Sequence, residues 1–204
     1  MKKKLVITLC SLFLVCAFAL VAVFAATAFN VESRLTVSFN VGDNRQCSVV
    51  AVLTPENVDG YTVPYEKTGI VKANSNNGEL SLDFGTLIVN RPDSKWTITI
   101  TIKNSGSNNM KVNFEVPSSV VGNLKISEAV YNSDGVVYSD ANCTTATSVA
   151  NNVYLKGGSG PESDDGGTLT LTQTIEIANK NKPVNEGSDN DTSVSLSWVG
   201  NFGA

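Results

Sequence analysis

A strict alternation of apolar and polar side chains is the feature of this sequence that most restricts its fold. In the segment WTITITIK, residues 96–103, a tryptophan and three isoleucines occupy every second position, with threonines and a lysine between them. Because successive side chains of a β-strand point to opposite faces of a sheet, this pattern predicts a strand with one buried face. The segment NSG that follows predicts a turn.

The same period of two recurs along the chain between segments rich in Gly, Asn, Ser and Pro. The expected strands are residues 35–41, 47–53, 80–84, 96–102, 112–116, 124–126, 136–138, 168–177 and 194–198. Beyond the first residues, no window has the period of an amphipathic helix. Short strands without covering helices bury their apolar faces by packing sheet on sheet. We therefore predict an all-β fold, a two-sheet antiparallel β-sandwich of jelly-roll or immunoglobulin-like type. Trp198 is expected to be a core anchor of the last strand.

The N-terminal segment predicts export. Three lysines at positions 2–4 precede a long apolar run that ends in small residues, and this is the layout of a secretory signal peptide. Cleavage is expected after Ala28, before Phe29, or after Ala25. The apolar run is also long enough to cross a bilayer as a helix, so an uncleaved signal anchor is the alternative. In both cases the lysines keep the N-terminus in the cytoplasm and the rest of the chain is exported.

These observations divide the chain into two parts. Residues 1–28 are predicted to be a signal peptide or membrane anchor, and residues 29–204 a single β-sandwich domain that is secreted or held at the cell surface. The exported part has 12 basic against 19 acidic residues, a net charge of −7. We therefore do not expect nucleic acid as a partner, because binding phosphates needs clustered Lys and Arg. The membrane is expected to contact only the N-terminal segment.

The chain contains no histidine. Its absence removes the Ser-His-Asp and Cys-His catalytic arrangements and the usual zinc sites. Asp and Glu are plentiful, but no pair of them is marked for glycoside hydrolysis. We therefore expect no enzymatic activity and no cofactor.

Two cysteines, Cys47 and Cys143, lie in the predicted exported part. In an oxidising compartment an even pair predicts a disulfide, which would stabilise the fold by roughly 4–5 kcal/mol in the chain-entropy model. The alternative is two buried free thiols.

Acidic loops and tyrosines are the remaining candidates for binding. Two loops carry carboxylates suited to calcium, although neither has EF-hand spacing, and solvated flexible loops are the alternative. The acidic residues are Glu162, Asp164 and Asp165 in the first loop, and Glu186, Asp189 and Asp191 in the second. Five tyrosines are candidates for a sugar-stacking face, with individual packing in loops and edges as the alternative: Tyr61, Tyr65, Tyr131, Tyr138 and Tyr154. The sequons at Asn142 and Asn190 matter only in a glycosylating host.

The segment FGTLIVNRPDSKWTITITIKNSGSNNMKVNFEV, residues 84–116, resembles the strand, proline turn and strand module of exported Gram-positive β-sandwich proteins. Together with the long signal ending in FAATAFNVESRLTVSFNV, it is similar to the TasA and camelysin-like group, whose signals are cut by a dedicated signal peptidase. This resemblance implies an envelope or matrix protein with a jelly-roll fold. Some members assemble into fibres by donating an N-terminal strand to a neighbour. The protease activity associated with camelysin is not expected here, because the chain has no histidine for a zinc site.

We therefore expect a cell-surface or extracellular-matrix protein with a structural or interaction role, assembling with itself or with envelope partners. Residues 29–41 are the expected donated strand, because they follow the cleavage site and their alternation fits an open sheet edge. The alternative function is an adhesion module that binds carbohydrate or protein through loops at one end of the sandwich.

Overall fold

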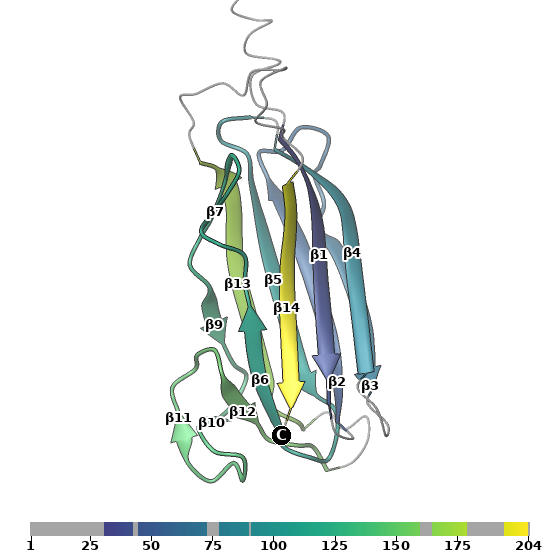
Figure 1. Ribbon diagram of the computed structural model, residues 1–204, viewed down its shortest axis with the longest axis vertical. Coiled ribbons are helices and arrows are strands. Elements are labelled where there is room, and N and C mark those ends of the chain that lie inside the picture. The colour runs from purple at the N-terminus through teal and green to yellow at the C-terminus, as the bar shows by residue number, and fades with distance from the viewer. Residues whose placement is uncertain are drawn as a thin grey trace, which may run out of the picture.

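The structure, a computed structural model, describes residues 31–42, 45–72, 78–89, 91–159, 165–178 and 194–203. These ranges form strands and turns without a helix (Figure 1). Accordingly, the described part of the chain has no helix suited to crossing a bilayer. The predicted signal segment, residues 1–28, and its cleavage site at Ala28 and Phe29 lie outside the described residues.

The strands of the described ranges form two sheets of seven, which confirms the all-β prediction. Sheet A faces the viewer in Figure 1. Its strands, in spatial order, are β11 (Ala146–Thr147), β10 (Val137–Tyr138), β12 (Val153–Leu155), β6 (Met110–Glu115), β14 (Val194–Gly203), β1 (Val31–Val41) and β4 (Gly78–Val89). Sheet B contains β3 (Tyr65–Lys72), β2 (Gln46–Glu56), β5 (Lys95–Asn104), β13 (Thr168–Ile177), β8 (Leu124–Ile126) and β7 (Val120–Val121), and β9 (Val130–Asn132) also pairs with β13.

The two sheets pack face to face through the alternating positions seen in the sequence. Along β5 and β13, every second side chain is buried, in the same register that the sequence predicts. One cluster of buried apolar residues draws on strands of both sheets, and its largest members include Trp96 and Trp198. Trp198 is fully buried, as expected for an anchor of the last strand. The alternation is therefore the direct cause of the sandwich.

The pairing of β1 corrects two predictions. The β1 strand lies between β14 and β4, so the expectation that residues 29–41 contain an open-edge strand is wrong. It pairs antiparallel with β4 but parallel with β14, from Ser33 opposite Val194 to Val41 opposite Phe202. The sheets are therefore mainly rather than wholly antiparallel. The polar outer face of β1 would suit an edge strand. It suits a strand in the middle of sheet A equally well, because only the opposite face of β1 contacts the core.

Several strands were not expected from the sequence. The longest is β3, at the edge of sheet B, where most side chains are exposed and Ile70 is 61% exposed. Such an edge strand buries little apolar surface, so it lacks the alternation that marks β5. The short strands β7, β9, β11 and β12 have only two or three residues each and give no periodic signal.

Candidate functional surface

The residues proposed as calcium ligands fall mainly outside the described part of the chain. Only Asp165 is described, and its Oδ1 accepts a hydrogen bond from the Ser159 backbone N–H at 2.9 Å. This bond holds the pKa of the Asp165 carboxyl below its usual range. Among the described residues no group of three or more His, Cys, Asp or Glu side chains is placed to hold a metal ion.

Cys47 and Cys143 are both free thiols in the structure, and only Cys47 is buried. Cys47 is buried in β2, and burial raises the pKa of its thiol to about 12. Cys143 is partly exposed in the loop between β10 and β11, and desolvation followed by the nearby Asp140 carboxylate raises the pKa of its thiol. Asp140 closes that loop by accepting hydrogen bonds from the backbone of Thr144 and Thr145.

These environments predict very different thiol reactivities. The thiolate is the nucleophile, and each unit of raised pKa lowers its fraction about tenfold, so buried Cys47 is expected to react far more slowly than Cys143. Alkylation of the native protein with iodoacetamide at pH 8, followed by peptide mapping, should label Cys143 first, by at least about tenfold. Unfolding in guanidinium should remove the difference. A Cys47–Cys143 cross-linked peptide, with neither thiol labelled before reduction, would contradict the free-thiol state.

The five tyrosines do not form one sugar-stacking face. Tyr61 and Tyr65 gather around Trp96, with ring centroids 5.3 and 6.3 Å from it. Tyr131 lies 6.4 Å from the ring of Phe114. These contacts are packing contacts of the kind expected for half-buried tyrosines. The remaining two tyrosines, on β10 and β12, are neighbours on the outer face of sheet A.

A shallow hollow on this outer face gathers amide side chains. It has a volume of ≈ 350 Å³ and lies where β1, β14, β6 and the residue before β12 meet. We call it the outer-face hollow, and its lining includes Asn40, Asn113, Asn152 and Asn201 together with Lys111. The sequence prediction missed these asparagines, because each is an ordinary polar residue on the outward side of its own strand. Only the pairing of the strands brings them together.

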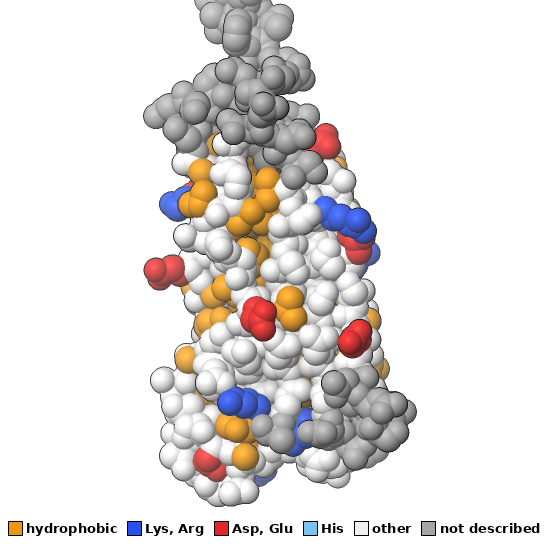
Figure 2. Space-filling model, viewed as in Figure 1, with side chains coloured by type: hydrophobic (Ala, Val, Ile, Leu, Met, Phe, Trp, Pro, Cys, Tyr) orange, Lys and Arg blue, Asp and Glu red, His pale blue; other side chains and the backbone are white. Residues whose placement is uncertain are grey.

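The strand register explains why the asparagines form a row. Asn201 of β14 lies opposite Asn40 of β1 on one side and opposite Asn113 of β6 on the other. Val153 of β12 lies opposite Val112 of β6, so Asn152 is placed next to Asn113. Four amide side chains thus cross neighbouring strands in one line. In Figure 2 most of this face is uncharged, with an acidic side chain near its middle and a basic side chain beside hydrophobic ones over the region of β12.

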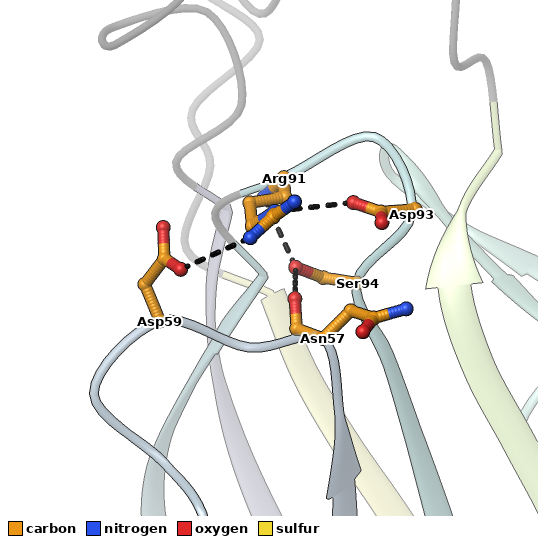
Figure 3. Close-up of polar contacts among 5 residues, drawn as sticks. All are labelled: Asn57, Asp59, Arg91, Asp93 and Ser94. Atoms are coloured by element: carbon orange, nitrogen blue, oxygen red, sulfur yellow. Dashed lines mark hydrogen bonds and ion pairs between the residues drawn. The ribbon is translucent and has the colours of Figure 1, made fainter.

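A second polar cluster, at the other end of the sandwich, ties two loops together (Figure 3). The guanidinium group of Arg91 lies between Asp93 and Asp59, with N–O distances of 3.2 and 3.4 Å. The buried hydroxyl of Ser94 accepts a hydrogen bond from the Arg91 backbone N–H at 3.1 Å and donates one to the carbonyl oxygen of Asn57 at 2.7 Å. These side chains satisfy one another, and the exposed ion pairs of Arg91 stabilise the fold only weakly. The cluster is therefore a clamp between the β2–β3 and β4–β5 connections.

Neither the predicted sequons nor the comparison with known proteins identifies a functional site. Asn142 is exposed in the loop between β10 and β11, and Asn190 lies outside the described residues. Comparison with protein-family models and with curated proteins finds no match to this chain.

Proposed function

We propose that this chain is an exported protein of the cell surface or extracellular matrix, with a structural or interaction role, and that copies associate by exchanging β1. The sequence supports export through the lysines and the apolar run of residues 1–28. The resemblance to the TasA and camelysin-like group supports an envelope or matrix role and a jelly-roll or immunoglobulin-like form of the sandwich.

The position of β1 within sheet A is the observation that supports the exchange. Its inward side chains Leu35, Val37, Phe39 and Val41 are each 0% exposed, so the strand fills a slot between β14 and β4. Only residues 42–45 join it to β2, which lies in the other sheet. The β1 strand of a neighbouring copy would make the same contacts with β14 and β4.

Exchange of an identical element between copies is a low-cost route to association, because it replaces intramolecular contacts by equal intermolecular ones. A connection as short as residues 42–45 favours exchange if closing it within one copy is strained. When each copy gives its strand to the next, the contact is head-to-tail and produces open filaments. Cleavage after Ala28 would leave only Phe29 and Asn30 before β1, and would free this strand to leave its own sandwich.

A cross-strand disulfide tests the exchange. Ser38 of β1 and Ser81 of β4 lie directly opposite each other and face away from the core. In a Cys143→Ser background, the pair Ser38→Cys and Ser81→Cys should lock β1 in its own copy once oxidised as a monomer. Negative-stain microscopy and light scattering should then show filaments for the parent and for Ser38→Cys alone, and monomers for the locked protein until it is reduced.

Two outcomes would count against this proposal. Filaments formed equally well by the locked protein would show that β1 need not leave its slot. A parent protein that stays monomeric at high concentration would remove self-association altogether.

A second candidate function is an adhesion module that binds carbohydrate or protein. The outer-face hollow favours it, because the hollow presents polar side chains on a rigid pair of sheets rather than on loops at one end of the sandwich.

A further inference from the structure

The amide row contains both fixed and free hydrogen-bonding groups. Asn40 Nδ2 donates to Asn201 Oδ1 at 3.0 Å, and Asn201 Nδ2 donates to Glu115 Oε1 at 2.8 Å. This chain of bonds holds two of the amides in place. For the side-chain amides of Asn113 and Asn152, no hydrogen-bond partner is found in the described ranges of the chain. Since each amide has two N–H donors and an acceptor oxygen, the hollow retains free donors and acceptors side by side.

The position of Asn152 is held by its neighbour in sequence. Asn151 Oδ1 accepts a hydrogen bond from the Phe114 backbone N–H at 2.7 Å, and Asn151 Nδ2 donates to the Phe114 carbonyl oxygen at 2.9 Å. The side chain of Asn151 thus bonds to β6 as a paired strand residue would. Asn152 itself has a positive φ of 65°, a conformation that asparagine adopts more readily than most residues. Backbone and side-chain bonds together therefore present Asn152 beside Asn113.

Aromatic rings border the amide row. Lys111 of β6 lies opposite Tyr154 of β12, which lies opposite Tyr138 of β10, so the three form the next row on the same face. The Nζ atom of Lys111 is 5.8 Å from the centre of the Tyr154 ring. Both tyrosines are half-buried, which leaves part of each ring accessible. The surface thus combines flat apolar rings with uncharged donors and acceptors.

This combination matches the chemistry of a neutral sugar. Neighbouring hydroxyls of a pyranose both donate and accept hydrogen bonds, as an amide does, and the C–H face of the ring stacks on an aromatic side chain. The hollow volume of ≈ 350 Å³ falls within the roughly 300–1,000 Å³ typical of small-ligand sites. Lys111 is the one charged side chain among the described lining residues, and the carboxylate of Glu115 accepts a hydrogen bond from Asn201 of the same lining. The two opposite charges leave no net positive charge to select an anionic glycan.

We propose that the outer-face hollow binds a neutral oligosaccharide, with Asn113 and Asn152 bonding its hydroxyls and Tyr154 stacking on a sugar ring. The proposal rests on the second candidate function, the adhesion module, and is independent of the exchange of β1. It places the sugar on a sheet face rather than on the loops at one end of the sandwich.

The test is binding of the purified exported protein to an array of neutral and anionic oligosaccharides, including β-linked glucose, galactose and N-acetylglucosamine oligomers. The neutral probe retained best is then titrated by calorimetry. Asn113→Ala and Asn152→Ala should each weaken binding about fivefold, and Tyr154→Ala by more, since one hydrogen bond contributes about 1 kcal/mol and tenfold in affinity is 1.4 kcal/mol. Asn132→Ala, on β9 of sheet B, is the matched control and should bind as the parent does.

Thermal unfolding of each variant shows whether a loss of binding results from loss of the site or from loss of the fold. Because Asn113 makes no described side-chain bond, Asn113→Ala should unfold at the parent temperature, so that its loss of binding reports the site. Asn152→Ala should unfold slightly earlier, because alanine adopts the positive φ of this residue less readily than asparagine. Asn152→Gly, which removes the amide without that strain, should lose binding to the same degree. The proposal is overturned if no neutral probe is retained, if only anionic probes bind, or if Asn113→Ala and Asn152→Ala bind as tightly as the parent. If these variants instead weaken binding of a protein partner, the sugar ligand is wrong while the adhesion-module function stands.

Discussion

Replacement of Trp198 by alanine is expected to lower the free energy of unfolding by about 3–5 kcal/mol. Trp198 is 0% exposed in the cluster between the sheets, so its removal leaves a large cavity. A domain of this kind is stable by only about 5–15 kcal/mol, so the variant should unfold at much lower denaturant or not fold at all. Guanidinium unfolding followed by far-ultraviolet circular dichroism gives the change in the midpoint.

Part of the effect of Trp198 comes from a polar bridge across the core. Its indole N–H donates to Gln173 Oε1 at 2.6 Å, and Gln173 Nε2 donates to the Ser127 carbonyl oxygen at 2.8 Å. Gln173 is 2% exposed and lies on β13 of sheet B, so the bridge joins the two sheets. Loss of either partner leaves a buried polar group unsatisfied, at a cost of about 1–3 kcal/mol.

A double-mutant cycle separates this bridge from the packing of the ring. Trp198→Phe and Gln173→Leu should each destabilise the protein, whereas the double variant should be more stable than the sum of the two losses. The gain is expected because replacing both partners by apolar groups leaves fewer buried polar atoms unsatisfied. If the two effects are additive, the bridge does not contribute to stability as a unit.

Replacement of Phe39 by alanine is the second large effect, with an expected loss of about 3–5 kcal/mol. Phe39 is 0% exposed on β1, and its ring stacks on Phe202 of β14 with centroids 6.0 Å apart. Gly200 lies beneath both rings, since a Cβ atom there would be 2.7 Å from the Phe202 ring and 2.9 Å from the Phe39 ring. The loss should therefore loosen β1 specifically at its contact with β14.

Hydrogen exchange followed by mass spectrometry locates this loosening. In Phe39→Ala, amides of β1 and β14 should exchange faster than those of β5 and β13. Ser38→Ala, on the outward face of the same strand, is the control and should change stability by less than about 0.5 kcal/mol. Uniformly faster exchange in both sheets would show that β1 is not a separate unit of stability.

The residues that alternate most regularly were the easiest to place. Residues 96–102 and 168–177 were expected as strands and form most of β5 and the whole of β13. Even the position of Gln173 follows the pattern, because it stands in line with Leu169, Leu171 and Ile175 on the inward face. A polar residue at such an inward position predicts a buried hydrogen bond, because leaving a buried polar group unsatisfied is costly.

Strand order and the candidate site were not predictable in the same way. The alternation of residues 35–41 indicates which side chains point inward but not which strands lie on either side. The amide row depends on Asn40 and Asn113 meeting Asn201, and these residues are brought together only by pairings between distant parts of the chain. Such pairings are decided by competition for partners among all the strands. The alternation within one strand does not contain this information.

The parallel pair of β1 and β14 also has a consequence for the order of events in folding. Asn40 and its partner Asn201 are 161 residues apart, so β1 can pair with β4 early but gains its second neighbour in sheet A only when β14 is available. Contacts of such long range slow folding, because the loop between them must close first. Until β14 pairs with it, β1 presents an open sheet edge with unpaired backbone N–H and C=O groups. During this interval a chaperone, or the position of β1 in an already folded copy, competes with β14 for the unpaired β1 strand.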